Sequence, residues 1–452
     1  MIIPRFHFDA RANRHKCMIK APILVSRNST SASTPKLIYP LGKPNPIMEI
    51  LADVGGRPGL DCKGFCSYCY FRGVKGVRPF GCKYCMPFQK GCDYCSRAIV
   101  EGYPGFKPLD AVLFDVAQKC MGSIPDKVTI SGGGDLSCYP DLLPLARMVG
   151  QGMVPISLGY TSGKGFKSAD QAEALVKEGV NEVSFTAFST NPELRRKYMG
   201  DRSPEIALAN LKTFCESCEV YCAAVLIPGV NDGAELEKTC NDLEEMGAKG
   251  LILMRFANAR EHGLILGNAP IIPGIVPHTV EEFREIVTET AKRHRFRVTG
   301  TPLWDPVTGA PFALAGHPEA ISLLPGLRRG ATVITGSVAA PLLRSIFKHI
   351  GKKVNVVAVN KDVGCLITIE DFKNLDLAGV MGTVIIPGRT LAHEKEIKRV
   401  LSRDGQDRTV VRGPDRLTVD GEMSISMKAE EVLDLEIEAF GELIEAINAM
   451  GV

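Results

Sequence analysis

The chain has 452 residues, of which 45% are hydrophobic and 23% charged, and its formal net charge is +3. The length is ordinary for about three domains, and the composition is that of a globular protein. The nearly balanced charge does not favour nucleic-acid binding. No apolar run reaches the ~20 residues that cross a bilayer, and the first residues contain no continuous apolar core before a small-residue cleavage site. We therefore expect a cytoplasmic protein that is not secreted and has no nucleic-acid or membrane partners.

The first 47 residues differ in character from the rest. They combine a basic start, around Arg11 and Arg14, with a Ser/Thr/Pro stretch over residues 29–35 that lacks apolar periodicity. Such a segment cannot bury a core, and we interpret residues 1–47 as a disordered or misassigned extension, with Met48 the expected natural start.

From Met48 onward, apolar strands and amphipathic helices alternate about six times. The predicted strands are residues 50–54, 127–131, 154–158, 182–187, 220–227 and 251–255. The predicted helices are residues 109–121, 141–150, 169–178, 203–214, 234–246 and 281–293. This alternation favours an α/β fold, a partial (βα)6 barrel with its chemistry at the carboxyl ends of the strands. We assign residues 48–107 to the first strand and a cysteine-rich metal loop, and residues 108–300 to the barrel.

Residues 301–452 predict a second, mixed α/β domain. A strand–helix–strand unit over 331–335, 338–350 and 354–359 precedes strand-like runs at 365–369, 383–386 and 409–411. Asp420-Gly421, between residues 417–419 and 423–426, is a hairpin signal. The chain ends in a predicted helix with one apolar stripe, formed by Val432, Leu435, Phe440, Leu443, Ile444 and Ile447.

Cysteine is the informative residue type. Of 15 cysteines, seven lie between Cys62 and Cys95. A cytoplasmic protein keeps its thiols reduced, so this concentration indicates metal ligands rather than disulfides. The other eight are expected to be small buried apolar residues or surface thiols, including those of the Cys215, Cys218 and Cys222 group.

The first cysteine group is a C-x3-C-x2-C triad of Cys62, Cys66 and Cys69. Three thiolates on a short loop can ligate three irons of a [4Fe–4S] cluster and leave the fourth open. That iron can chelate S-adenosylmethionine, whose reductive cleavage releases a 5′-deoxyadenosyl radical. The alternative is a structural zinc-binding loop, a zinc knuckle. Tyr68 suits packing against adenine, and Tyr70 is a candidate to approach the open iron.

A glycine run follows the second predicted strand. Gly132, Gly133 and Gly134 have no Cβ to obstruct close approach of the backbone to a ligand. Asp135, which comes next, can accept a hydrogen bond from the ammonium of the same cofactor. An ordinary glycine-rich turn is the alternative, but the position one helix and one strand after the triad favours cofactor binding.

The second cysteine group is Cys82-x2-Cys85-x6-Cys92-x2-Cys95. Two C-x2-C pairs this close predict a tetrahedral tetrathiolate metal site. Spacing alone does not separate zinc from iron, because both metals accept four thiolates.

The triad after the first strand and the glycines after the second resemble the radical S-adenosylmethionine (SAM) superfamily. The usual second element of that superfamily is Gly-Gly-Glu-Pro; here Asp135 takes the place of the glutamate and no proline follows it directly. The resemblance extends to Ser184 and Asn231, on the later strands where the superfamily contacts ribose and adenine.

Residues 52–97 as a block resemble the methanogenesis marker protein 10 family, and a weaker likeness runs from about Met48 to the C-terminus. The leader of 47 residues is a departure from that family. The resemblance implies a mononuclear iron in the tetrathiolate loop and a C-terminal cobalamin domain. None of the eight histidines lies in an Asp-x-His-x-x-Gly pattern, so no protein histidine is expected beneath cobalt. The Thr335-Gly336-Ser337 junction offers backbone N–H groups to a ligand, or is simply a helix start.

The resemblance further implies a cobalamin-dependent methyltransferase that acts on an arginine carbon of the methyl-coenzyme M reductase α subunit and depends on an electron donor. Asp305 is expected to hold the substrate guanidinium, although its Asp-Pro pair is also a turn signal. One rival hypothesis is a cobalamin-independent radical SAM peptide-modifying or maturation enzyme. Another is a zinc-bound binding module without catalysis.

Overall fold

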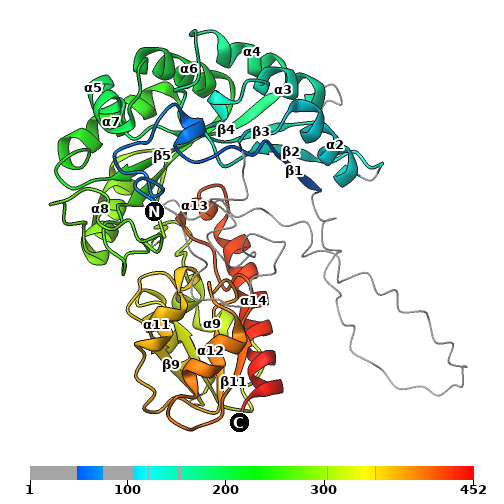
Figure 1. Ribbon diagram of the computed structural model, residues 1–452, viewed down its shortest axis with the longest axis vertical. Helices are drawn as coiled ribbons and strands as arrows, with labels where there is room; N and C mark the ends of the chain where they lie inside the picture. The colour runs from blue at the N-terminus through cyan, green and yellow to red at the C-terminus, as the bar shows by residue number, and fades with distance from the viewer. Residues whose placement is uncertain (1–47, 75–104, 121, 151–153, 303, 352) are drawn as a thin grey trace, which may run out of the picture.

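A computed structural model describes residues 48–74, 105–120, 122–150, 154–302, 304–351 and 353–452 (Figure 1). The predicted extension over residues 1–47 lies outside these described residues. So do Cys82, Cys85, Cys92 and Cys95, which would form the predicted tetrathiolate site.

The first sheet contains seven parallel strands in sequential order. They are β1 (Glu49–Asp53), β2 (Lys127–Ser131), β3 (Ile156–Thr161), β4 (Val180–Thr186), β5 (Glu219–Leu226), β6 (Gly250–Arg255) and β7 (Arg297–Thr301). Strands β1 and β7 are its two edges, so the sheet curls without joining its ends. The predicted partial barrel is confirmed, with seven strands in place of the six expected.

Helices cover the convex side of this sheet. They are α2 (Leu109–Cys120), α3 (Leu142–Gly150), α4 (Gln171–Lys177), α5 (Pro192–Leu194), α6 (Pro204–Ser217), α7 (Gly233–Met246) and α8 (Val280–Arg293). Short turns of helix are η2 (Leu60–Cys62), η3 (Leu136–Cys138) and η4 (Arg195–Met199). In β4, Val183 and Phe185 are buried in the core under the helices, whereas Ser184 between them is only half-buried. This alternation is the period of a strand, and it leaves polar side chains on the concave face.

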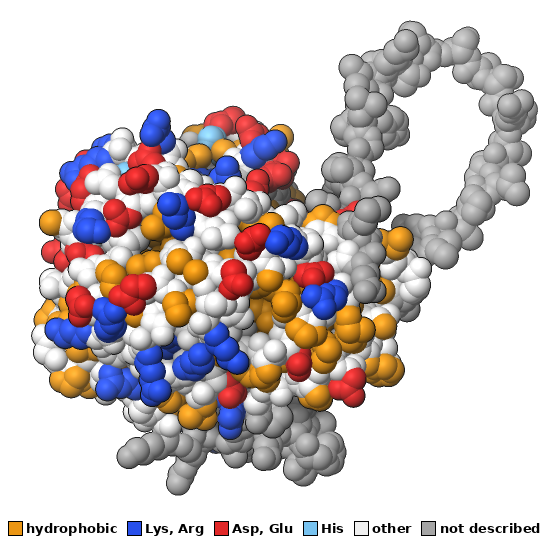
Figure 2. All heavy atoms as spheres, turned by 90° about the horizontal axis from the view of Figure 1, so that it is seen from above, with side chains coloured by type: hydrophobic (Ala, Val, Ile, Leu, Met, Phe, Trp, Pro, Cys, Tyr) orange, Lys and Arg blue, Asp and Glu red, His pale blue; other side chains and the backbone are white. Residues whose placement is uncertain are grey.

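The outer surface of the barrel carries charges of both signs. In Figure 2, which looks down on the helices at the top of Figure 1, Lys and Arg side chains are interspersed with Asp and Glu. No helix among the described residues combines the length and apolar character that crossing a membrane requires.

The C-terminal domain has a second sheet of four strands, all parallel, in the order β11-β10-β8-β9. The strands are β8 (Ala331–Thr335), β9 (Val354–Ala358), β10 (Thr383–Ile386) and β11 (Thr409–Arg412). Its helices are η5 (Ala313–Gly316), α9 (Pro318–Ile321), α10 (Ala339–Ile350), η6 (Gly364–Leu366), α11 (Ile369–Lys373), α12 (Glu394–Leu401), α13 (Gly421–Ser424) and α14 (Ala429–Met450). Separate apolar cores cover its two faces. The predicted terminal helix is confirmed as α14.

Two sequence predictions in this domain were wrong. The Asp420-Gly421 pair begins helix α13 rather than a hairpin, because the Asp420 carboxylate caps the N–H groups of Glu422 and Met423, each at 3.1 Å. The expected strand at residues 365–369 is η6 followed by the start of α11. There, Thr368 and a carboxylate three residues later form a capping box that starts a helix.

The two domains meet where β7 contacts α13. The Thr299 hydroxyl donates to the Gly421 carbonyl at 2.5 Å, and Arg297 donates to the Met427 carbonyl at 2.5 Å. A buried ion pair, Arg255–Asp362 at 2.5 Å, joins the end of β6 to the loop after β9. The C-terminal domain is therefore fixed at the open side of the barrel.

Candidate functional site

The cluster loop, residues 54–74, leaves the carboxyl end of β1 and carries the cysteine triad. Its backbone is held locally: Arg57 Nε pairs with Asp61 Oδ2 at 3.0 Å, and the Gly59 N–H donates to Cys62 Sγ at 3.3 Å. Gly59 has φ 77°, and a Cβ there would lie 2.1 Å from the ring of Phe65. Only glycine permits this turn, which brings the first thiol to the mouth of the barrel.

The three thiols of Cys62, Cys66 and Cys69 lie in a partly buried setting, and Cys69 is only 8% exposed. Burial raises the pKa of Cys69 to about 12, and the neighbouring Cys66 adds to the shift. Burial also raises the pKa of the Cys66 thiol, against the opposing charge of Lys164. Thiols in such a setting become thiolates when a metal supplies the compensating positive charge.

The triad suits a cluster better than a single ion. Within the part of the chain that the structure describes, no three His, Cys, Asp or Glu side chains gather around one metal position. An iron–sulfur cluster makes a different demand, because each thiolate binds a different iron. The Tyr68 hydroxyl is buried beside the Cys66 thiol without a nitrogen or oxygen partner among the described residues. A cluster thiolate would accept its hydrogen bond, so these residues fit the group.

The two aromatic residues of the triad segment contact protein groups. The Tyr68 ring stacks on Phe188, with centroids 4.8 Å apart and 16° between the planes, so one ring face expected to meet adenine is already covered. The Tyr70 hydroxyl donates to the Gly263 carbonyl and accepts from the Ile265 N–H at 3.2 Å. The structure thus gives the Tyr70 phenol two backbone partners in the loop after β6, and its approach to iron stays a prediction.

The glycine run packs against the cluster loop. A Cβ at Gly132 would lie 2.2 Å from the Gly55 carbonyl oxygen, and the Gly133 N–H donates to that oxygen at 2.7 Å. A Cβ at Gly56 would lie 2.7 Å from the Gly134 nitrogen. The close approach anticipated for these glycines is therefore made, in this structure, between two backbone segments. It sets the cluster loop against the end of β2.

Asp135 joins the ends of β2 and β3. Its Oδ1 accepts from the Ser137 N–H at 3.0 Å, the Ser137 hydroxyl at 2.8 Å and the Thr161 hydroxyl at 3.0 Å. Its Oδ2 accepts from the Ser162 hydroxyl. With both oxygens bonded and the residue only 5% exposed, Asp135 positions the loop, and its contact with an ammonium stays a prediction. Sequence reasoning missed Ser137, Thr161 and Ser162.

The two residues predicted to contact ribose and adenine have different environments. Ser184 is half-buried in β4, opposite Tyr221 of β5. Asn231 is 2% exposed; its amide donates to the Phe188 and Val225 carbonyls, each at 2.9 Å, and its oxygen accepts from Ile227 N–H at 2.8 Å. Asn231 thus holds the turn after β5, and Ser184 stays a candidate on the concave face.

Two buried cations near the triad were also missed. Lys164, in the loop after β3, donates to the carbonyls of Gly64 and Met199 and lies 4.0 Å from Cys66 Sγ. Arg195 is fully buried and paired with Asp201 at 2.8 Å. A lysine between two glycines directly after a strand was the available signal for Lys164, whereas nothing local marked Arg195.

Asp305 has partners other than the expected guanidinium ligand. Its carboxylate is fully buried, pairs with Arg297 at 2.7 Å, and accepts from the Thr308 hydroxyl at 2.7 Å and the Val307 N–H at 2.9 Å. These bonds build the turn after β7. A role of Asp305 in holding a substrate guanidinium stays a prediction.

The C-terminal cavity is a hollow of about 350 Å³ at the carboxyl ends of β8 and β10. Its lining includes the apolar residues Val333, Ile385 and Leu443 and the charged residues Arg389 and Asp420. Pro302, directly after β7, also lines it, so the cavity adjoins the open side of the barrel. Ligands of parallel α/β sheets bind at this edge.

The loops around this cavity touch one another closely. A Cβ at Gly336 would lie 2.6 Å from the Asp362 carbonyl oxygen. The Ser337 N–H donates to the Lys361 carbonyl at 2.7 Å, so that N–H, expected to serve a ligand, bonds the loop after β9 instead. Burial raises the pKa of the lining thiol Cys365 to about 12, which keeps it protonated at neutral pH.

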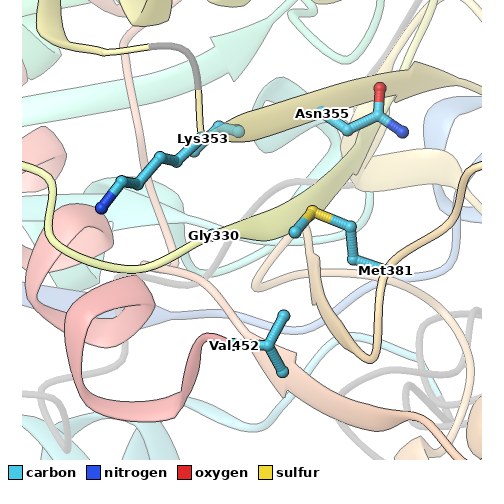
Figure 3. Close-up of a pocket in the computed structure, with 6 residues that line it drawn as sticks. Gly330, Lys353, Asn355, Met381 and Val452 are labelled. Atoms are coloured by element: carbon cyan, nitrogen blue, oxygen red, sulfur yellow. The ribbon is translucent and has the colours of Figure 1, made fainter.

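A second hollow, of about 500 Å³, lies at the opposite edge of the same sheet, before β8 and β9. Figure 3 shows Lys353, Met381 and Val452 around it. It is shallow and carries one charged side chain, Lys353, so it offers no chemistry comparable to the cluster loop.

The sequence profile of the Radical SAM superfamily matches residues 57–243, from the cluster loop into α7. The chain contains a radical SAM domain. The [4Fe–4S] cluster and SAM expected from the cysteine triad are the cofactors of such a domain, and Cys62, Cys66 and Cys69 are the residues that would hold the cluster.

A search of curated proteins found no match. Among solved structures, SuiB from Streptococcus suis is 13% identical, with a TM-score of 0.40, covering 62% of this chain and 54% of that one. A radical SAM methyltransferase from Sphaerobacter thermophilus is 18% identical, with a TM-score of 0.33 and coverage of 46% and 61%. TsrM from Kitasatospora setae, with cobalamin and a cluster bound, is 11% identical, with a TM-score of 0.31 and coverage of 46% and 34%. The chain thus spans about half the length of SuiB.

Proposed function

We propose that this radical SAM protein is a cobalamin-dependent C-methyltransferase that methylates an sp3 carbon of an arginine in the methyl-coenzyme M reductase α subunit. The proposal starts from the resemblance of residues 52–97 to the methanogenesis marker protein 10 family. The observation that supports it further is the C-terminal cavity, which we propose as a second ligand site at the open side of the radical SAM barrel.

The lining of the cavity suits the two kinds of surface that a corrin presents. Val333, Ile385 and Leu443 would meet its methyl-bearing ring, and polar lining residues such as Thr335 and Arg389 would meet its amides. No histidine lines the cavity among the described residues. Cobalt bound at this site would therefore have no lining imidazole beneath it.

A saturated arginine carbon is not a nucleophile, so it cannot attack the methyl group of the SAM sulfonium directly. Bound cobalamin would supply a methyl group that a carbon radical can accept. The cluster loop, with its three cysteines, holds the site where the radical originates, and the reaction needs an electron donor. The domain contact at Thr299–Gly421 and Arg255–Asp362 keeps the two sites in a fixed relation. Orientation and exclusion of competing partners are the protein's contribution.

The tetrathiolate of Cys82, Cys85, Cys92 and Cys95 is proposed to hold a mononuclear iron, with zinc as the alternative. Metal analysis of anaerobically prepared protein separates them. Iron beyond the four atoms of the cluster favours the mononuclear iron, whereas one zinc per chain favours the alternative. Zinc with no iron or sulfide after reconstitution would favour a binding module without catalysis.

Mass spectrometry of the reductase α subunit tests the substrate. In cells lacking this gene, one arginine should be lighter by a methylene, and purified protein supplied with SAM, cobalamin and a reductant should restore that mass on a peptide containing the arginine. An unchanged arginine in the deletion strain would refute the substrate. Protein purified anaerobically with cobalamin that never acquires corrin absorbance would favour the cobalamin-independent peptide-modifying enzyme.

A further inference from the structure

Lys164 is a buried cation at the edge of the cysteine triad. The residue is 7% exposed, and its Nζ donates to the Gly64 carbonyl at 3.0 Å and to the Met199 carbonyl at 3.0 Å. The same nitrogen lies 4.0 Å from Cys66 Sγ. Gly64 belongs to the cluster loop and Met199 ends η4, so two separate segments hold the ammonium against the thiol.

The charge of Lys164 lacks the compensation that other buried cations have. Arg195 pairs with Asp201, and Lys361 pairs with Asp371 at 3.0 Å. Lys164 forms no ion pair with a carboxylate within the described ranges of the chain; its partners are two neutral carbonyls and a sulfur. Burying an ammonium without an opposite charge is costly, so its side chain is placed for an anion that arrives at the sulfur.

A neutral Cys66 thiol cannot serve as that anion, but a thiolate bound to a [4Fe–4S] cluster can. With three thiolate ligands the cluster is negative, and it becomes more negative by one charge when it takes up an electron. A fixed positive charge beside a cluster ligand, shielded from water, stabilises the reduced form more than the oxidised form. The positive charge therefore makes the cluster easier to reduce.

We propose that Lys164 is the counter-ion of the cluster, a positioning residue that raises the reduction potential through its contact with Cys66. The step it assists is the transfer of one electron from an external one-electron donor to the cluster, without a proton and without breaking a bond. This role goes beyond the proposed methylation and is separate from it, because it concerns only the cluster.

The test is a redox titration of the cluster, followed by electron paramagnetic resonance in the absence of SAM. Lys164→Gln and Lys164→Met remove the charge, and Lys164→Arg keeps it. At the midpoint potential of the unaltered protein, the ratio of reduced to oxidised cluster should fall at least about tenfold in the first two variants, which is about 59 mV for one electron. Lys164→Arg should stay within about twofold.

Lys63→Gln is the matched control. Lys63 also carries a positive charge in the cluster loop, next to Cys62, but it is exposed and donates to the Gly165 carbonyl at 3.2 Å. Water screens an exposed charge, so its removal should change the ratio by less than about twofold. An equal shift in Lys63→Gln would show a general loop effect and overturn the proposal.

Iron and sulfide analysis shows whether each variant holds a full cluster. A full cluster with an unchanged potential in Lys164→Gln would overturn the proposal. A change that emerges only after SAM is added would do so too, because Lys164 would then act on the SAM carboxylate. Failure of Gln and Met to assemble a cluster while Arg succeeds would support the charge pairing. Failure of all three variants would point to side-chain shape and overturn it.

Discussion

The cluster loop and the C-terminal cavity, the two proposed ligand sites, are built in opposite ways. At the cluster loop, individual side chains carry the chemistry: three thiols, a glycine run and buried charged groups with named partners. At the C-terminal cavity, apolar side chains from several strands and loops form a surface, and no single residue identifies a ligand. A metal site therefore depends on the types and spacing of a few residues, whereas an apolar cavity depends on how many side chains are arranged in space.

Removal of one cluster thiol should distinguish the functions of the two sites most clearly. Cys66→Ala should reduce 5′-deoxyadenosine formation by more than about 100-fold, because a cluster with an open iron needs all three thiolates. Cobalamin binding, measured by corrin absorbance, should persist. Cys120→Ala, at the end of α2, is the control and should retain the activity. Substantial 5′-deoxyadenosine from Cys66→Ala would contradict the assignment of the triad.

The reciprocal experiment fills the C-terminal cavity. Ala339 lines it at the start of α10, and Ala339→Trp should weaken cobalamin binding at least about tenfold by occupying the space. Formation of 5′-deoxyadenosine should be unaffected. Lys348→Trp places the same ring at an exposed position of α10 and should bind cobalamin normally. Equal affinity in the two variants, measured by absorbance titration, would place cobalamin elsewhere.

A smaller effect is expected at Asp135, on the barrel side of the comparison. Asp135→Asn replaces one accepting oxygen with an NH2 group, which faces the donors of Ser137 in the place of Oδ1 or the Ser162 hydroxyl in the place of Oδ2. The change should lower the free energy of unfolding by about 1–3 kcal/mol. Urea denaturation measures this. Asp115→Asn breaks an exposed pair with Lys119 and should cost less than about 0.5 kcal/mol. Similar values for the two variants would mean that the Asp135 network contributes little.

The smallest effect is a change in pH dependence, on the C-terminal side. Glu436 accepts from the N–H groups of Phe312 at 2.9 Å and Leu314 at 2.8 Å, and burial raises the pKa of its carboxyl. The folded state therefore holds this proton more tightly than the unfolded state. The resulting contribution to stability is complete below the ordinary carboxyl pKa and is lost as the pH rises through the raised value.

Glu436→Gln should remove this part of the pH dependence, in addition to a loss of about 1–2 kcal/mol from poorer acceptance of hydrogen bonds. Urea denaturation at a series of pH values from 4 upward, limited to the range where the protein stays folded, provides the comparison. Glu442→Gln, at an exposed position of the same helix, should keep the profile of the unaltered protein. Parallel profiles for the Glu436 and Glu442 variants would count against the raised pKa.

Much of the fold was predictable because its strands are rich in apolar residues and regularly spaced; the bounds of β2 in the barrel and of β8 and β10 in the C-terminal sheet agree with the prediction. The cysteine triad was predictable because iron ligation requires thiolates at short spacing. The wrong predictions concern short segments whose sequence is compatible with more than one local structure. Asp420 can begin a turn or cap a helix, and contact of Gly421 with Gly300, where a Cβ would lie 2.3 Å from the carbonyl oxygen, accompanies the helix.

The sequence by itself determined the fold class, the cysteines that would bind a cluster and the glycines at the end of β2, because these depend on residue type and spacing along the chain. Only the tertiary structure decided that Asp135 bonds to hydroxyls of the next loop and that Lys164 reaches Cys66 from 98 positions away. It also decided that four strands leave an apolar hollow beside the barrel. Contacts between distant segments arise from packing of the whole chain, so they cannot be predicted from the local sequence of either segment.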